Sequence, residues 1–140
     1  MAEQDGIQPN LPWEAPPPPR TPEELAALGD QDLLRLRLKD LPLRLKATPL
    51  EPLVRELHRE LRARGIAFLP PCYLSTEWFV ERHETAIGVP FFLAHPRLVR
   101  LERRMVMDVE GELEADALRI LRHESGHAID HAFRLHARPD

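Results

Sequence analysis

The spacing of His123 and His127 constrains this chain more than any other feature of its sequence. The two histidines are four residues apart in the segment His123-Glu124-Ser125-Gly126-His127, and no proline interrupts the residues on either side. Residues four apart on an α-helix lie on the same face, one turn above the other. The segment therefore predicts a helix that presents two imidazole rings side by side.

These residue types suit a zinc site. Neutral imidazole nitrogen is a common ligand of Zn²⁺, and in the pattern H-E-x-x-H the glutamate serves as general base toward water that the metal activates. We therefore predict His123 and His127 as metal ligands and Glu124 as the catalytic base. Several of the surrounding positions are uncharged, as expected for a helix buried behind a metal: Ile120, Leu121, Ser125, Gly126, Ala128 and Ile129. The alternative is a solvated amphipathic helix that carries two surface histidines.

Gly126 lies inside this predicted helix, where glycine costs about 1 kcal/mol relative to alanine. A small residue at this position predicts that another group approaches the helix closely.

Five segments of the chain resemble a family of bacterial zinc-binding metallopeptidases of the gluzincin type. They are T-P-L-E-P-L at 48–53, Y-L-S-T-E-W-F at 73–79, V-P-F-F-L-A-H-P-R-L at 89–98, L-E-R-R-M at 101–105 and R-I-L-R-H-E-S-G-H-A-I-D-H-A-F-R-L-H at 119–136. The resemblance covers about the C-terminal two thirds of the chain. It implies a zincin-like N-terminal subdomain in which two histidines and a downstream glutamate hold zinc. The histidines and Glu124 match that pattern.

For a third zinc ligand the sequence offers several candidates. The glutamate that the resemblance implies is not in the chain, which ends at Asp140, so we expect a fragment or a truncated homologue. The metzincin continuation is disfavoured because Asp130 and Phe133 stand where that pattern has glycine and histidine. Asp130 and His131 are the candidates for a third ligand or for a position behind the ligands. His95 is a candidate oxyanion or rim residue, with a capping role as the alternative.

Composition limits the classes of function. The chain has 140 residues, which suits one domain, and its net charge of −4 gives no electrostatic support for binding nucleic acid. No stretch is long and apolar enough to cross a membrane. A single cysteine, Cys72, and a polar N-terminus without signal-peptide features favour a cytoplasmic protein.

The N-terminal segment is rich in proline, including four consecutive prolines at 16–19. Such a run favours extended polyproline II and does not build a core. We therefore predict a disordered tail over residues 1–20 and a zincin-like domain over 21–140. With Arg20, residues 16–20 are also a candidate ligand for a partner that recognises proline-rich segments.

The remaining pattern predicts an α+β fold: a small mixed or antiparallel sheet with packed helices and a long C-terminal helix that carries the motif. Helices are expected at 21–28, 48–64, 97–106 and 112–136. Strands are expected at 66–74 and 86–94, with an edge strand at 41–46 and an ambiguous segment before it. The resemblance also implies a strand edge that binds a substrate backbone, for which residues 88–94 are the candidate. The predicted inward residues of the last helix are Leu113, Ala117, Leu121, Ala128 and Phe133.

Three functions are compatible with these patterns. The first is a zinc-dependent metallopeptidase-like domain that acts on a peptide or protein substrate. The second is a metal-binding module without catalysis, and the third is an interaction protein that acts through its proline-rich tail.

Overall fold

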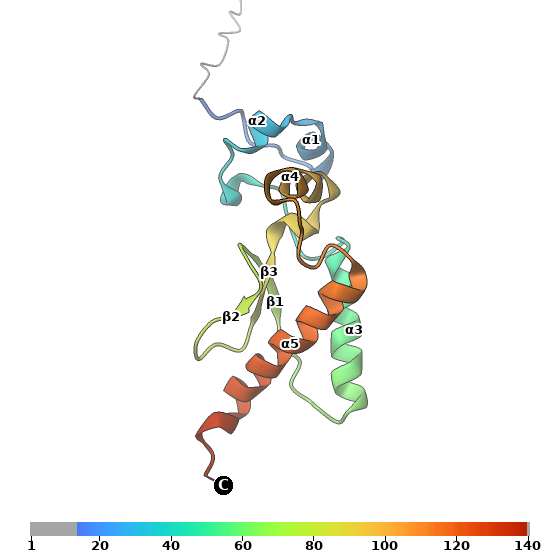
Figure 1. Ribbon diagram of the computed structural model, residues 1–140, viewed down its shortest axis with the longest axis vertical. Helices are drawn as coiled ribbons and strands as arrows, with labels where there is room; N and C mark the ends of the chain where they lie inside the picture. Colours follow the sequence, from blue (N-terminus) through green and yellow to red (C-terminus); the bar gives the residue numbers. More distant parts are fainter. Residues whose placement is uncertain (1–13, 140) are drawn as a thin grey trace, which may run out of the picture. The chain divides into compact units, whose positions relative to one another are not determined.

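The computed structural model describes residues 14–139 and divides them into two compact units, one ending at Pro42 and the other beginning at Leu43 (Figure 1). Most of the tail predicted over residues 1–20 lies outside the described residues. Within the described part, no helix is both long enough and apolar enough to cross a membrane. The candidate site belongs entirely to the second unit.

The first unit contains the short helices α1 (Pro22–Ala27) and α2 (Asp30–Leu33) and the 3₁₀ turn η1 (Leu38–Asp40). Thr21 caps α1: its Oγ1 accepts a hydrogen bond from the backbone N–H of Glu24 at 3.1 Å. The edge strand predicted over 41–46 is wrong, because the segment pairs with no strand. Instead, Leu43 and Leu45 pack against the core of the second unit, so their alternating pattern reflects packing rather than a ladder.

The second unit contains a mixed sheet of β1 (Cys72–Ser75), β2 (Phe79–Val80) and β3 (Ile87–Pro90), in the spatial order β1-β3-β2. The strand β3 pairs in parallel with β1 and antiparallel with β2. The α+β class with a small mixed sheet is thus confirmed. The edge position predicted for residues 88–94 is wrong, because β3 is the central strand and residues 91–94 form the 3₁₀ turn η2 (Phe91–Ala94).

Gly88 explains how β2 approaches β3 so closely. A Cβ atom at this position would lie 2.7 Å from Cε1 of Phe79, which is its direct partner in the antiparallel register. Pro90, which has no N–H, ends the central strand and therefore interrupts no later ladder bond.

Three longer helices complete the unit: α3 (Leu50–Ala63), α4 (Pro96–Val106) and α5 (Glu114–Phe133), with the 3₁₀ turn η3 (Leu135–Ala137) after the last. The helix α3 lies within the predicted range of 48–64, and its capping residue is Pro49, which makes no side-chain hydrogen bond. Glu51 reaches back to the backbone N–H of Ala47 at 2.7 Å, and Gly65 follows the helix with φ +74°, the left-handed conformation that favours glycine.

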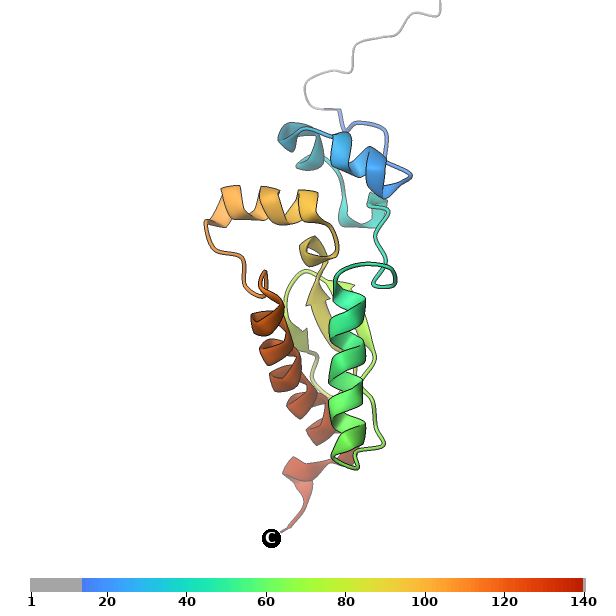
Figure 2. The same cartoon turned by 90° about the vertical axis from the view of Figure 1, so that its right-hand side faces the viewer.

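The core lies where α3, α5 and the sheet meet, and α5 contacts α3, β2 and β3 (Figure 2). Its buried members come from these elements and the segments that join them: Leu50, Leu57, Leu61, Ile87, Val89, Leu93, Ala94, Val109, Leu121 and Ala128. Ala117 is buried as predicted, but the predictions for Leu113 and Phe133 are wrong, since they are 68% and 44% exposed. Leu113 precedes the first turn of α5, and Phe133 ends its last turn, where its ring contacts that of Phe68 edge-on.

Candidate metal centre

The helix α5 holds His123 and His127 one turn apart on an exposed face. Their Nε2 atoms are 3.2 Å apart, and the ring centroids are separated by 4.9 Å with the planes at 79°. At this separation one neutral ring donates a hydrogen bond to the other, or the lone pairs of both nitrogens face a shared cation. The structure therefore brings the two predicted ligands together through their ring nitrogens.

The residues between the histidines divide between the two sides of the helix. Ser125 is buried, and its hydroxyl donates a 2.7 Å hydrogen bond to the backbone carbonyl of Arg122 in the preceding turn. Glu124, the predicted base, is half-buried beside His123. Gly126 is exposed, and apart from its chain neighbours and the backbone of its own helix no described atom lies within 4 Å of the position a Cβ would occupy. Packing among residues 14–139 therefore does not account for the glycine.

The candidates for a third ligand have other partners. Both carboxylate oxygens of Asp130 bind His136: one accepts from its backbone N–H at 2.8 Å and the other lies 3.1 Å from its Nδ1. The Nδ1 atom of His131 lies 2.7 Å from the carbonyl oxygen of Glu84, so this nitrogen carries the proton and donates. In the part of the chain that is described, no three His, Cys, Asp or Glu side chains gather in a metal-binding group.

His95 stands at the start of α4, where its Nδ1 accepts a 3.0 Å hydrogen bond from the backbone N–H of Arg97. His95 thus caps the start of α4, which is the role that the sequence offered as the alternative to an oxyanion or rim position. An accepting Nδ1 leaves the proton of a neutral ring on Nε2.

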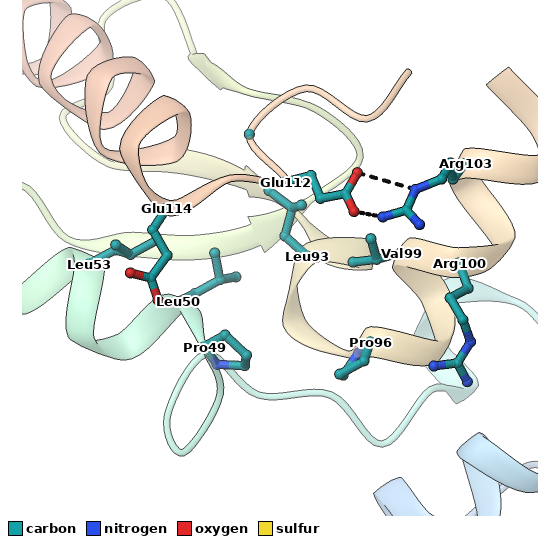
Figure 3. Close-up of a pocket in the computed structure, with 11 residues that line it drawn as sticks. Pro49, Leu50, Leu53, Leu93, Pro96, Val99, Arg100, Arg103, Glu112 and Glu114 are labelled. Atoms are coloured by element: carbon teal, nitrogen blue, oxygen red, sulfur yellow. Dashed lines mark hydrogen bonds and ion pairs between the residues drawn. The ribbon is translucent and has the colours of Figure 1, made fainter. Parts of the chain in front are cut away.

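The acidic residues before α5 belong to a different part of the unit. Glu112 is bound to Arg103 of α4, with 3.4 Å between Arg103 Nε and Glu112 Oε2 (Figure 3). With Glu114, these side chains border a cavity of about 310 Å³, whose floor is formed by Pro49, Leu50, Leu53, Leu93, Pro96 and Val99. The floor is apolar and offers no ligand to a metal.

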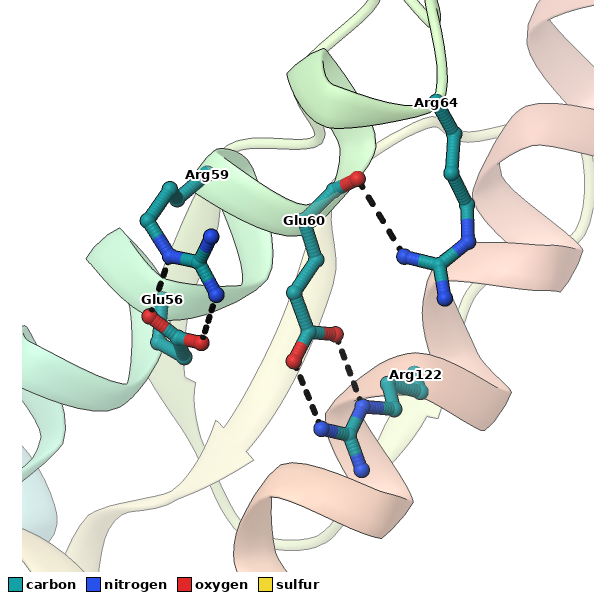
Figure 4. A network of polar contacts seen from close by, with 5 residues as sticks. All are labelled: Glu56, Arg59, Glu60, Arg64 and Arg122. Atoms are coloured by element: carbon teal, nitrogen blue, oxygen red, sulfur yellow. Dashed lines mark hydrogen bonds and ion pairs between the residues drawn. The ribbon is translucent and has the colours of Figure 1, made fainter.

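A polar network that sequence reasoning missed connects α3 to α5 immediately before the motif (Figure 4). Arg122 donates two hydrogen bonds to the Glu60 carboxylate, Nε to Oε2 at 2.8 Å and Nη2 to Oε1 at 2.6 Å. The hydrogen bond from Arg122 lowers the pKa of the Glu60 carboxyl. A second pair, Glu56 and Arg59, lies wholly within α3. No local sequence signal predicts the first pair, because its members are 62 residues apart.

Cys72 is unsuited to nucleophilic catalysis at neutral pH. Burial in β1 raises the pKa of its thiol to about 12, so the thiolate that would attack a substrate is scarce. Its side chain packs against the core of the unit.

Comparisons of the chain with models of protein families, with curated proteins and with solved structures find no match.

Proposed function

We propose that this chain is a metallopeptidase-like domain of the gluzincin type, in which His123 and His127 hold Zn²⁺ and Glu124 is the general base. The observation that carries the proposal is the 3.2 Å separation of the two Nε2 atoms on an exposed helix face. Its substrate class is a peptide or protein, and the single cysteine favours a cytoplasmic location.

The donor set fits zinc in kind and in spacing. Two ligands at Zn–N distances of about 2.0–2.1 Å in a tetrahedral site lie about 3.3–3.4 Å apart, close to the separation of these imidazole nitrogens. A catalytic site takes three protein ligands, and residues 14–139 bring two together. The proposal therefore includes a third ligand from outside this group, for which the resemblance implies a glutamate.

The roles proposed for the side chains follow from the chemistry of the pattern H-E-x-x-H. Zn²⁺, when bound, supplies a Lewis acid that brings the acidity of water into the neutral range. Glu124 then accepts a proton from the attacking water and passes it to the leaving amine as the peptide bond breaks. His123 and His127 remain neutral ligands throughout, because only the unprotonated nitrogen has a lone pair to donate.

The test combines metal analysis with a peptidase assay. The native chain, incubated with zinc and freed of excess metal, is analysed for bound zinc and assayed on a mixture of internally quenched fluorogenic peptides. We expect Glu124→Gln to keep its zinc and to lose activity by about 100-fold or more, the usual contribution of a general base. His127→Ala is expected to lose the zinc itself.

Glu112→Gln is the matched control, because it neutralises a carboxylate that is bound to Arg103 and lies outside the motif. It should keep both zinc and activity. Native protein that binds no zinc would refute the proposal, and so would equal activity in the Glu124→Gln variant.

A second candidate is a metal-binding module without catalysis. It is favoured because, among the described residues, no third His, Cys, Asp or Glu side chain joins the two histidines in a metal-binding group. Bound zinc with no hydrolysis of any peptide in the mixture would decide for this candidate.

A further inference from the structure

The inward face of α5 carries large side chains in the turn before the motif and small ones at the motif. Ile120 and Leu121 are buried in that preceding turn, and Ser125 and Ala128 are buried at the motif. Helices lock against their neighbours when large side chains form ridges that fit into grooves. Small side chains form shallow ridges, so packing by Ser125 and Ala128 restrains the rotation of the motif turn less than packing by Ile120 and Leu121 restrains the turn before it.

The ion pair between Glu60 and Arg122 supplies a restraint at this point. Both carboxylate oxygens and two guanidinium nitrogens take part, at 2.8 and 2.6 Å, and such a paired geometry fixes the direction of the arginine side chain. The Glu60 side chain is only 16% exposed, whereas that of Arg122 is 51% exposed. Glu60 is therefore held on α3, and it ties α5 to that helix.

Arg122 also stands directly beside the proposed ligands in sequence. It is the residue before His123, and its backbone carbonyl accepts the hydrogen bond from Ser125. A rotation of this turn would move the Arg122 guanidinium away from Glu60 and would turn both histidines by the same angle, since all three share one helix.

We infer that Glu60 and Arg122 are positioning residues for the metal centre, which fix the rotation of the α5 turn that carries His123 and His127. The inference rests on the proposed function, since it concerns the same two histidines. The pair touches neither metal nor substrate; it acts by holding the two imidazoles on the outward face.

The test measures cobalt and zinc binding by the full chain. Apo protein is titrated with Co²⁺, whose visible spectrum reports ligand geometry, and then with Zn²⁺ in competition. We expect Glu60→Gln and Arg122→Lys each to weaken metal binding by about three- to ten-fold, at or below the lower end of the loss typical for groups that orient ligands. The cobalt spectrum should change in both variants.

Glu56→Gln is the matched control, because Glu56 pairs with Arg59 within α3 and not with α5. It should leave the affinity and the spectrum unchanged, although it too removes a carboxylate from an ion pair of this helix. The double variant E60R/R122E, which restores a pair with the charges reversed, should recover affinity relative to either E60R or R122E alone. The cobalt spectrum of the folded, metal-saturated protein is the readout that a loss of stability alone does not change.

The outcomes separate this inference from the proposed function. If the native chain binds metal and Glu60→Gln binds it equally well, the positioning role is wrong and the zinc site stands. If Glu56→Gln weakens binding as much as Glu60→Gln, the effect is one of charge and the positioning role is again wrong. If the native chain binds no metal, both proposals fail.

Discussion

The helices α3 and α5 lie side by side, but they differ in the size of the side chains that they bury. The inward stripe of α3 consists of large aliphatic residues, Leu50, Val54, Leu57 and Leu61. The inward stripe of α5 has Ala117, Ser125 and Ala128 beside Ile120 and Leu121, while its outward face carries the two histidines. The comparison indicates that α3 contributes mainly buried aliphatic surface, whereas α5 also carries polar groups on its exposed face. Three variants test this difference between the two helices.

The largest expected effect is on α3. Leu57 is 1% exposed in the core, so Leu57→Ala removes buried methyl groups and leaves a cavity. We expect the free energy of unfolding to fall by about 2–5 kcal/mol, measured by urea denaturation. Leu113→Ala makes the same chemical change at a side chain that is 68% exposed, and it should shift the value by no more than about 0.5 kcal/mol. Equal losses in the two variants would contradict the assignment of the core.

A smaller effect, of opposite sign, is expected at Gly126 of α5. Beyond its chain neighbours and its own helix backbone, a Cβ at this position meets no described atom within 4 Å, so Gly126→Ala should stabilise the helix by about 1 kcal/mol. Ala132→Gly, at another exposed position of the same helix, should cost a similar amount. Thermal and urea unfolding of the pair would check both signs. A loss of stability in Gly126→Ala would show that the open face of α5 is covered in the folded protein.

The smallest effect concerns pH and the connection between the two helices. The hydrogen bond from Arg122 lowers the pKa of Glu60 in the folded chain below its value in the unfolded chain. The ion pair therefore contributes fully to the free energy of unfolding above the pKa that Glu60 has in the unfolded chain. This contribution is lost as the pH falls through the pKa that Glu60 has in the folded chain. Native protein should exceed Glu60→Gln in stability at pH 7, and the difference should shrink below pH of about 4. A difference that stays constant over this range would show that Glu60 titrates normally.

Much of the helical part of the fold could be predicted from sequence, and so could the pairing of the histidines. Thr21 caps the first helix and Gly65 follows α3, because capping depends on groups within a few residues of each other. His123 and His127 meet for the same reason, since one helical turn separates them. The strand prediction at 41–46 was wrong because alternating leucines occur both in a strand that is hydrogen-bonded within a sheet and in an extended segment that only packs against a core.

The sequence by itself thus located the long helices, with α3 inside 48–64 and α5 inside 112–136, and determined which two imidazoles share a turn. Only the tertiary structure decided that β3 is the central strand, that Glu60 binds Arg122 and that His131 donates to the carbonyl of Glu84. Glu60 and Arg122 are 62 positions apart in the sequence, and Glu84 and His131 are 47 positions apart. Such contacts depend on how whole elements pack against one another, and packing is set by the combined shape of many side chains rather than by any local pattern.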